Sequence, residues 1–193
     1  MKLLHLDSSI LGPHSASREL GAAVVARCQR DLPDLDVIHR DLAADPLPHL
    51  SGASLAQADA GEAATAATVL EEFMSADVVV VGAPMYNFGI PSQLKAWIDR
   101  VAVAGKTFRY TADGPQGLAG GKKVIVAATY GGAHPTASGR NFVEPYLRQV
   151  FAFLGINDIE FVNAEGLSLS PEHRANALEA AQERIKVALP LAA

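Results

Sequence analysis

The stretch of sequence that decides the fold is VVVVGAP, at residues 78–84. It begins with four consecutive valines, and β-branched side chains favour a strand. Because no polar residue alternates with the valines, we expect both faces of this strand to be buried, which is typical of a parallel sheet. The rest of the chain then has to supply helices that cover both faces, as in an α/β protein.

Outward from this strand, short β-rich runs alternate with helical patterns in both directions. The runs cover residues 3–6, 37–42, 78–81, 124–129 and 159–162. Between them apolar residues recur at helical spacing, for example Leu94, Trp97 and Val101. Five parallel strands joined by helices fit the flavodoxin-like doubly wound sheet, with strand order 2-1-3-4-5. We predict a single domain of this kind over residues 1–193.

Two connections and two unusual residues complete this outline. Residues 43–64 and 105–122 are longer than ordinary connections, and we expect functional or mobile loops there. The one cysteine, Cys28, has no disulfide partner and lies on an apolar helical stripe, so we interpret it as a core residue. Trp97 also lies on such a stripe and is expected in the core.

Charge and composition restrict the partners and the location. The chain has 21 Asp and Glu against 16 Lys and Arg, a net charge of −5, and no basic cluster, so we expect no nucleic-acid partner. The first residues lack an apolar signal core, and no apolar run approaches the roughly 18 residues of a membrane span. We therefore expect a cytoplasmic protein without a membrane partner.

The ligand cleft is predicted where the strand order reverses, because the loops after the first and third strands face each other there. The first of these loops gathers Ser9, Ser15, Ala16 and Ser17 where the next helix begins. Hydroxyl groups and free amides at a helix N-terminus favour a phosphate. Alternatively, Ser15 or Ser17 only caps the helix, which leaves Ser9 unexplained. Since neither GxGxxG nor a P-loop is present, a monophosphate such as that of FMN fits best.

The loop after the third strand combines aromatic rings with an amide side chain. Its residues are Met85, Tyr86, Asn87 and Phe88. Rings can cover the face of a flat heterocycle such as flavin, while Asn87 and backbone amides bind its polar edge. The alternative is a tight loop whose aromatic side chains fill the edge of the sheet.

The loop after the fourth strand contains Thr129, Tyr130, Gly131 and Gly132. Two glycines let the backbone approach a ligand closely, and amides there could stabilise negative charge at N1 and O2 of a flavin. A plain turn explains the glycines equally well. For His134, which follows, a substrate contact and a surface-loop role both stay open.

No metal site is expected. His5, His39, His49 and His173 have no partner at ligand spacing in the sequence, which disfavours zinc. A signalling receiver would need clustered carboxylates for Mg²⁺, whereas Asp7 is followed by serines. A one-electron carrier of flavodoxin type stays open as an alternative, although such carriers usually present a more acidic docking face than a net charge of −5 provides.

The segments MYNF at residues 85–88 and FRYT at residues 108–111 resemble those of the FMN-dependent NADH:quinone oxidoreductases, a family also called azoreductases. Similar segments cover nearly the whole chain, from SSIL at residues 8–11 to AEG at residues 164–166. The resemblance implies ping-pong transfer of two electrons from NADH or NADPH, through FMN, to quinones and aromatic azo compounds.

The resemblance also implies roles for individual residues. Ser9 and residues 15–17 would bind the FMN phosphate, residues 85–88 and 129–132 would border the isoalloxazine ring, and Asn87 would lie near its N5 atom. The implied assembly is a homodimer with its active sites at the subunit interface. There, Tyr110 and Phe153 would form aromatic walls where the nicotinamide and the acceptor alternate.

Two departures from the family pattern concern substrate choice. Family members often carry Ser-Arg where this chain has Thr129-Tyr130, and the segment at residues 43–64 is short. Without that arginine a fixed positive charge is missing, so a preference for anionic dyes or for NADPH does not carry over.

Overall fold

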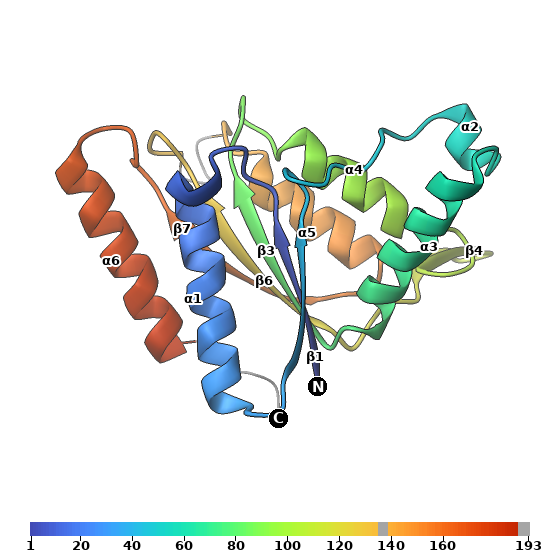
Figure 1. Ribbon diagram of the computed structural model, residues 1–193, viewed down its shortest axis with the longest axis horizontal. Helices are drawn as coiled ribbons and strands as arrows, with labels where there is room; N and C mark the ends of the chain where they lie inside the picture. Colours follow the sequence, from blue (N-terminus) through green and yellow to red (C-terminus); the bar gives the residue numbers. More distant parts are fainter. Residues whose placement is uncertain (135–138, 189–193) are drawn as a thin grey trace.

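The computed structural model describes residues 1–134 and 139–188 (Figure 1). Its central sheet has five strands in the order β2-β1-β3-β6-β7, and every neighbouring pair is parallel. This is the predicted order 2-1-3-4-5, because β4 and β5 lie outside this sheet. The five strands are β1 (Lys2–Asp7), β2 (Asp36–Asp41), β3 (Val78–Pro84), β6 (Lys123–Thr129) and β7 (Asp158–Ala164).

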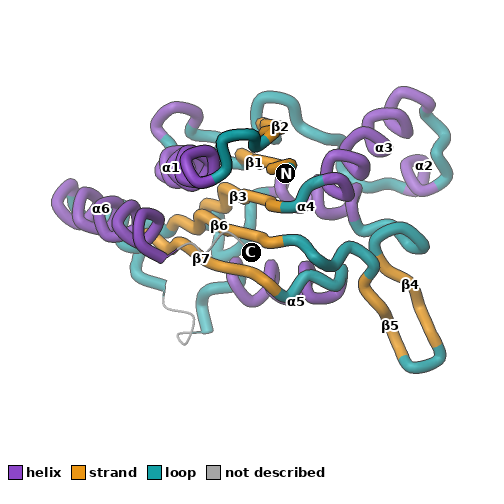
Figure 2. Tube along the Cα trace, turned by 90° about the horizontal axis from the view of Figure 1, so that it is seen from below, coloured by secondary structure: helices purple, strands orange, loops and turns teal. Residues whose placement is uncertain are grey.

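Helices cover both faces of the sheet, as the valine run requires (Figure 2). One face carries α1 (Ala16–Asp31) and α6 (Pro171–Ala188), and the other carries α3 (Ala60–Ser75), α4 (Ser92–Val101) and α5 (Val143–Phe153). Val78 and Val80 belong to the core under α1 and α6, whereas Val79 and Val81 belong to the opposite core. The strand is therefore buried on both faces because each is covered by its own helical layer.

Both long connections, where functional or mobile loops were expected, contain some regular structure. Residues 43–64 hold the short helix α2 (Gly52–Leu55) and the first turn of α3, which begins at Ala60. Residues 105–122 hold an antiparallel hairpin of β4 (Phe108–Thr111) and β5 (Gly114–Gly117).

The hairpin is anchored by a close contact with the end of α5. A Cβ atom at Gly117 would lie 2.1 Å from the backbone nitrogen of Gly155, so only a glycine allows the two backbones to meet. In addition, the amide of Ala119 donates to the carbonyl of Leu154 at 2.9 Å. Sequence patterns miss such a hairpin because its strands are short and its main support is distant along the chain.

The two expected core residues are buried. Trp97 packs edge-on against Phe73, with ring centroids 5.5 Å apart. Cys28 lies on the buried face of α1, and burial raises the pKa of its thiol to about 11. Among the described residues, no helix is long and apolar enough to cross a membrane.

Candidate functional site

The register of the sheet brings three loops to its carboxyl edge. Asp7 pairs with Gly82, and Pro84 pairs with Thr129, so the loops after β1, β3 and β6 emerge side by side. These loops line a cavity of about 190 Å³, and an open cleft lined by Asn87 and Gln93 continues from it. This cavity lies where the strand order reverses, which is the predicted position of the ligand site.

The loops after β1 and β3 are joined by hydrogen bonds. The hydroxyl of Ser8 donates to the carbonyl of Gly82 at 2.5 Å. The Oγ of Ser9 lies 3.1 Å from the hydroxyl of Tyr86, and the amide of Ile10 donates to that hydroxyl at 3.2 Å. Ser9 and Tyr86 therefore sit on facing walls of the same cavity.

At the start of α1, Ser15 has the capping role that was one of the two interpretations. Its side chain accepts from the amide of Arg18 at 3.3 Å, and its Oγ lies 3.0 Å from the Oγ of Ser17. Both serines are buried, and Ala16 lines the cavity beside Ser15. Because the first amides of a helix lack intrahelical acceptors, this end presents donors to the cavity.

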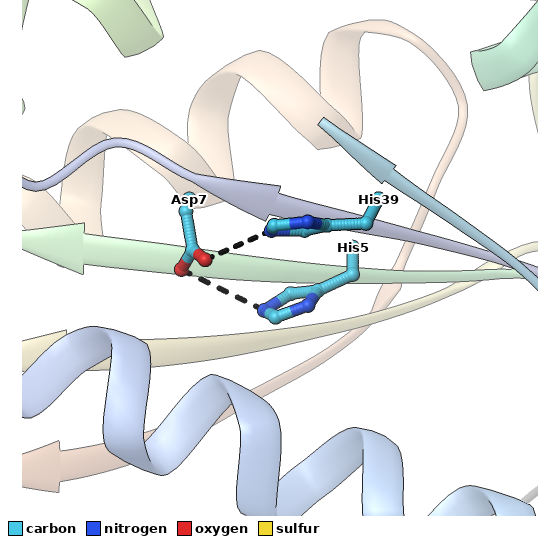
Figure 3. A group of neighbouring side chains, drawn as sticks. All are labelled: His5, Asp7 and His39. Carbon is cyan, nitrogen blue, oxygen red and sulfur yellow. Dashed lines mark hydrogen bonds and ion pairs between the residues drawn. The ribbon is translucent and has the colours of Figure 1, made fainter. Parts of the chain in front are cut away.

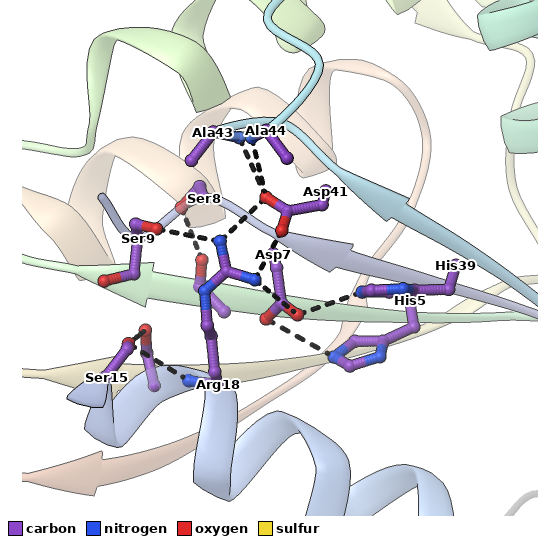
Figure 4. A network of polar contacts seen from close by, with 12 residues as sticks. His5, Asp7, Ser8, Ser9, Ser15, Arg18, His39, Asp41, Ala43 and Ala44 are labelled. Atoms are coloured by element: carbon purple, nitrogen blue, oxygen red, sulfur yellow. Dashed lines mark hydrogen bonds and ion pairs between the residues drawn. The ribbon is translucent and has the colours of Figure 1, made fainter. Parts of the chain in front are cut away.

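Arg18 ties the loop after β1 at residues 8–15, here called the serine loop, to β2 (Figure 4). Its guanidinium donates to both carboxylate oxygens of Asp41, at 2.6 and 2.7 Å, and to the carbonyl of Ser9 at 2.9 Å. The hydrogen bonds from Arg18 are the main reason why the pKa of Asp41 falls to about 2. A paired guanidinium of this kind supports the shape of the loop rather than supplying a free charge to a ligand.

The loop after β3 is a tight turn with a strained centre. Tyr86 and Gly89 exchange backbone hydrogen bonds of 2.9 and 3.1 Å. Between them, Asn87 and Phe88 have φ angles of +49° and +70°. Asparagine tolerates this left-handed region, but for phenylalanine it is a rare conformation of the kind that clusters at functional sites. Both side chains are exposed rather than filling the sheet edge, and Asn87 lines the open cleft.

In the loop after β6, neighbouring side chains leave little room for a side chain at either of the two glycines. A Cβ at Gly131 would lie 3.0 Å from the Oγ of Ser168, and one at Gly132 would lie 2.9 Å from Nε2 of His134. Tyr130 is only 1% exposed, and burial raises the pKa of its hydroxyl. The backbone of this loop borders the cavity while the tyrosine side chain belongs to the core.

His134 is not among the residues that line the cavity or the open cleft, and it lies beside Phe88. Its ring is perpendicular to the ring of Phe88, with centroids 5.9 Å apart, and its amide donates to Glu165 at 2.9 Å. These contacts fit the surface-loop role, which was one of the two interpretations of this residue.

Comparison with known proteins places this geometry in a family. A family described as having a flavodoxin-like fold matches residues 1–189. FMN-dependent NADH:quinone oxidoreductase 1 from Xanthomonas axonopodis pv. citri (strain 306) is 62% identical over 183 residues, which cover 94% of this chain and 93% of that protein. The chain belongs to the FMN-dependent NADH:quinone oxidoreductase family.

Other members of this oxidoreductase family are also similar over nearly their whole length. The FMN-dependent NADH:quinone oxidoreductase from Rhizobium meliloti (strain 1021) is 55% identical, with 96% of this chain and 95% of that protein covered. Among solved structures, an azoreductase from Bacillus anthracis str. Sterne superposes with a TM-score of 0.86 at 29% identity, covering 96% of this chain and 97% of that chain.

Two residues that the resemblance to the oxidoreductase family assigned to the site lie elsewhere in the single chain. Tyr110 is 75% exposed on the hairpin, and Phe153 is half-buried at the end of α5. The ring of Phe108 joins them, with centroids 4.5 Å from Phe153 and 5.6 Å from Tyr110. Neither residue lines the cavity near Ser9, and the hairpin projects from the body of the protein (Figure 2).

One cluster was missed by the sequence reasoning (Figure 3). His5 and His39 are partners in the parallel register of β1 and β2, and both approach the carboxylate of Asp7. The expectation that these two histidines lack partners at ligand spacing was therefore wrong, because that spacing arises between strands. A possible signal was the pair His5 and Asp7, which share one face of a strand.

Proposed function

We propose that the protein is an FMN-dependent NADH:quinone oxidoreductase that also reduces aromatic azo compounds. The observation that carries this function is the single cavity shared by the serine loop at the start of α1 and the strained turn after β3. Membership of a family whose relatives bear this enzyme name supports it. The azoreductase that superposes on the chain supports the azo substrates.

The donors at the start of α1 suit one phosphate group. Ser9, Ser15 and Ser17 are buried hydroxyl residues, and the first amides of the helix add partial positive charge. Arg18 is engaged by Asp41 and the carbonyl of Ser9, so the hydroxyls and helix amides would hold the phosphate, with Arg174 lining the same cavity. This group of hydrogen-bond donors fits the monophosphate of FMN better than the diphosphate of FAD.

The turn after β3 and the loop after β6 suit the flavin ring. Residues 85–88 would lie along the isoalloxazine, and the amide of Asn87 would bind the polar edge near N5. The backbone of residues 129–132 would border the opposite side. When bound, FMN supplies the hydride acceptor for NADH or NADPH and the two-electron donor for quinones and azo compounds. The residues of the chain position the ring, exclude water and tune its polar edge.

We also propose a homodimer with an active site at the subunit interface. An apolar depression of about 680 Å³, lined by residues such as Ile90, Phe142 and Tyr146, adjoins the cleft through Ile90 and Ser92. A second copy of the chain would cover this surface and bring aromatic residues to the open end of the cleft. Tyr110 and Phe153 would then contact the acceptor. The proposed location is the cytoplasm, in keeping with soluble nicotinamide as the electron source.

Identification of the flavin and its reduction test the function. The flavin released from the purified protein is identified by chromatography, and the protein is then titrated anaerobically with NADH. We expect FMN, its bleaching by NADH, and parallel lines in double-reciprocal plots with menadione as acceptor. Recovery of FAD would contradict the phosphate site, whereas bound FMN that NADH does not reduce would indicate a one-electron carrier.

A further inference from the structure

We propose that His5, Asp7 and His39 form a binding site for one divalent transition-metal cation such as Zn²⁺. The three residues each offer one ligand atom, and these atoms all lie within 4.8 Å of one another (Figure 3). The site lies behind the serine loop and lines neither the cavity nor the open cleft. It is therefore separate from the proposed oxidoreductase function.

The distances between the ligand atoms suit a single small ion. The Nε2 of His39 lies 3.0 Å from Oδ2 of Asp7, and the Nε2 of His5 lies 3.7 Å from Oδ1 of Asp7. Nitrogen and oxygen ligands at about 2.0–2.2 Å from a tetrahedral Zn²⁺ are separated from each other by about 3.4 Å. These two separations involve different oxygens of Asp7, and the three ligand atoms lie within 4.8 Å of one another. Side-chain rotation that draws the two imidazole nitrogens toward one carboxylate oxygen would complete the coordination.

Two of the ligand atoms are buried and lack a hydrogen-bond partner among the described residues. They are Nε2 of His5 and Oδ1 of Asp7, and their side chains are only 9% and 6% exposed. Buried polar atoms without partners are costly, and such atoms in a folded protein call for a ligand, an ion or a water molecule. Gly21 keeps space beside the imidazole, because a Cβ there would lie 2.8 Å from Nε2 of His5.

The surrounding charges permit a cation. Arg18 makes its short hydrogen bonds to Asp41, at 2.6 and 2.7 Å, whereas its contact with Asp7 is 3.5 Å. A metal ion bound through Oδ1 of Asp7 would leave the pair of Arg18 and Asp41 intact, with Arg18 remaining beside Oδ2. With neutral imidazoles, the two carboxylates and one guanidinium give this group a net charge of −1.

The chemical types of the ligand atoms indicate which metal ions the site would bind. Two imidazoles with one carboxylate suit Zn²⁺, Ni²⁺ or Cu²⁺, whereas Mg²⁺ and Ca²⁺ prefer oxygen ligands. The side chain of His39 is 50% exposed, which opens an entry path and a fourth position for water. Coordination would link β1 to β2 immediately before Ser8 and Ser9. We infer a structural ion that stabilises the strand supporting the serine loop.

Metal binding by the untagged full-length protein with its flavin tests this proposal. After dialysis against a chelator, Zn²⁺ binding is measured by calorimetry, and Co²⁺ is used as a visible-absorption probe of nitrogen coordination. We expect one ion per chain, a rise in Tm with Zn²⁺, and at least tenfold weaker binding for His39→Gln. The matched control is His49→Gln, since His49 is also an exposed histidine but lies outside the cluster.

Each outcome decides the proposal. Tight binding that His39→Gln weakens and His49→Gln leaves unchanged would support it. Absence of Zn²⁺ binding to the natural sequence would overturn it, as would equal binding by the His39→Gln protein. Equal weakening by both substitutions would assign the ion to scattered surface histidines. Flavin content and NADH oxidation are separate readouts, so failure here leaves the oxidoreductase function untouched.

Discussion

The hydroxyl of Tyr86 lies 3.1 Å from the Oγ of Ser9 and couples the loop after β3 to the loop after β1. The two residues are 77 positions apart along the chain, and they meet because β1 and β3 are neighbours in the sheet. The same hydroxyl accepts from the amide of Ile10. In the proposed function, this contact joins the phosphate-binding wall to the wall that carries the flavin ring.

Removing that hydroxyl should weaken flavin binding. Tyr86→Phe keeps the ring and deletes one link, worth about 1 kcal/mol, so we expect the Kd for FMN to rise about fivefold. Fluorescence titration of the apoprotein with FMN measures the change. Tyr110→Phe is the matched control, because it deletes an exposed hydroxyl on the hairpin. An unchanged Kd in Tyr86→Phe would mean that the contact does not support the cofactor.

The proposed role of the Asn87 side chain can be tested apart from the left-handed backbone of this residue by two substitutions. Asn87→Gly removes the amide without strain at a φ of +49°, whereas Asn87→Ala removes the amide and adds strain. We expect both proteins to fold and both to lose flavin reduction by NADH, about tenfold, in stopped-flow experiments. If Asn87→Gly reduced flavin at the natural rate, the amide would have no part in the reaction.

Tyr110 and Phe153 should affect the choice of acceptor more than they affect FMN affinity. Tyr110→Ala changes an exposed side chain, so stability should stay within about 0.5 kcal/mol, whereas Phe153→Ala also removes packing on Phe108 and should cost about 1–3 kcal/mol. Steady-state kinetics with a bulky azo dye and with menadione, beside a flavin titration, measure both effects. Loss of FMN with an unaltered acceptor ratio would assign Phe153 to the cofactor site or the core.

The thiol of Cys28 should be protected in the folded protein. Burial raises its pKa from 9.0 to about 11, so the thiolate fraction at pH 8 should be about 100-fold lower than in the unfolded chain. Reaction with a chromogenic disulfide reagent, with and without guanidinium, measures this protection. The rate of modification of the folded protein should keep rising with pH up to about 11, because the thiolate fraction rises over that range. Fast modification at pH 8 without denaturant would show that the helix layer opens readily.

The main features of the fold and of the cavity follow from local sequence. Four consecutive valines, flanked by alternating strand and helix patterns, indicate a doubly wound sheet because each element has to bury its own apolar face. In that topology the loops after β1 and β3 must meet, so the sequence predicts Ser9 and Asn87 on one cleft. The caps and the strained turn are likewise local properties of a few neighbouring residues.

Contacts between distant segments were decided only by the tertiary structure. The hairpin at residues 108–117 depends on the approach of Gly117 to Gly155, which no local pattern encodes. His5 and His39 become neighbours through strand register, since a shift of one residue would turn one ring to the other face of the sheet. Sequence periodicity reports which face a residue occupies, whereas register and packing decide which other residue it meets there.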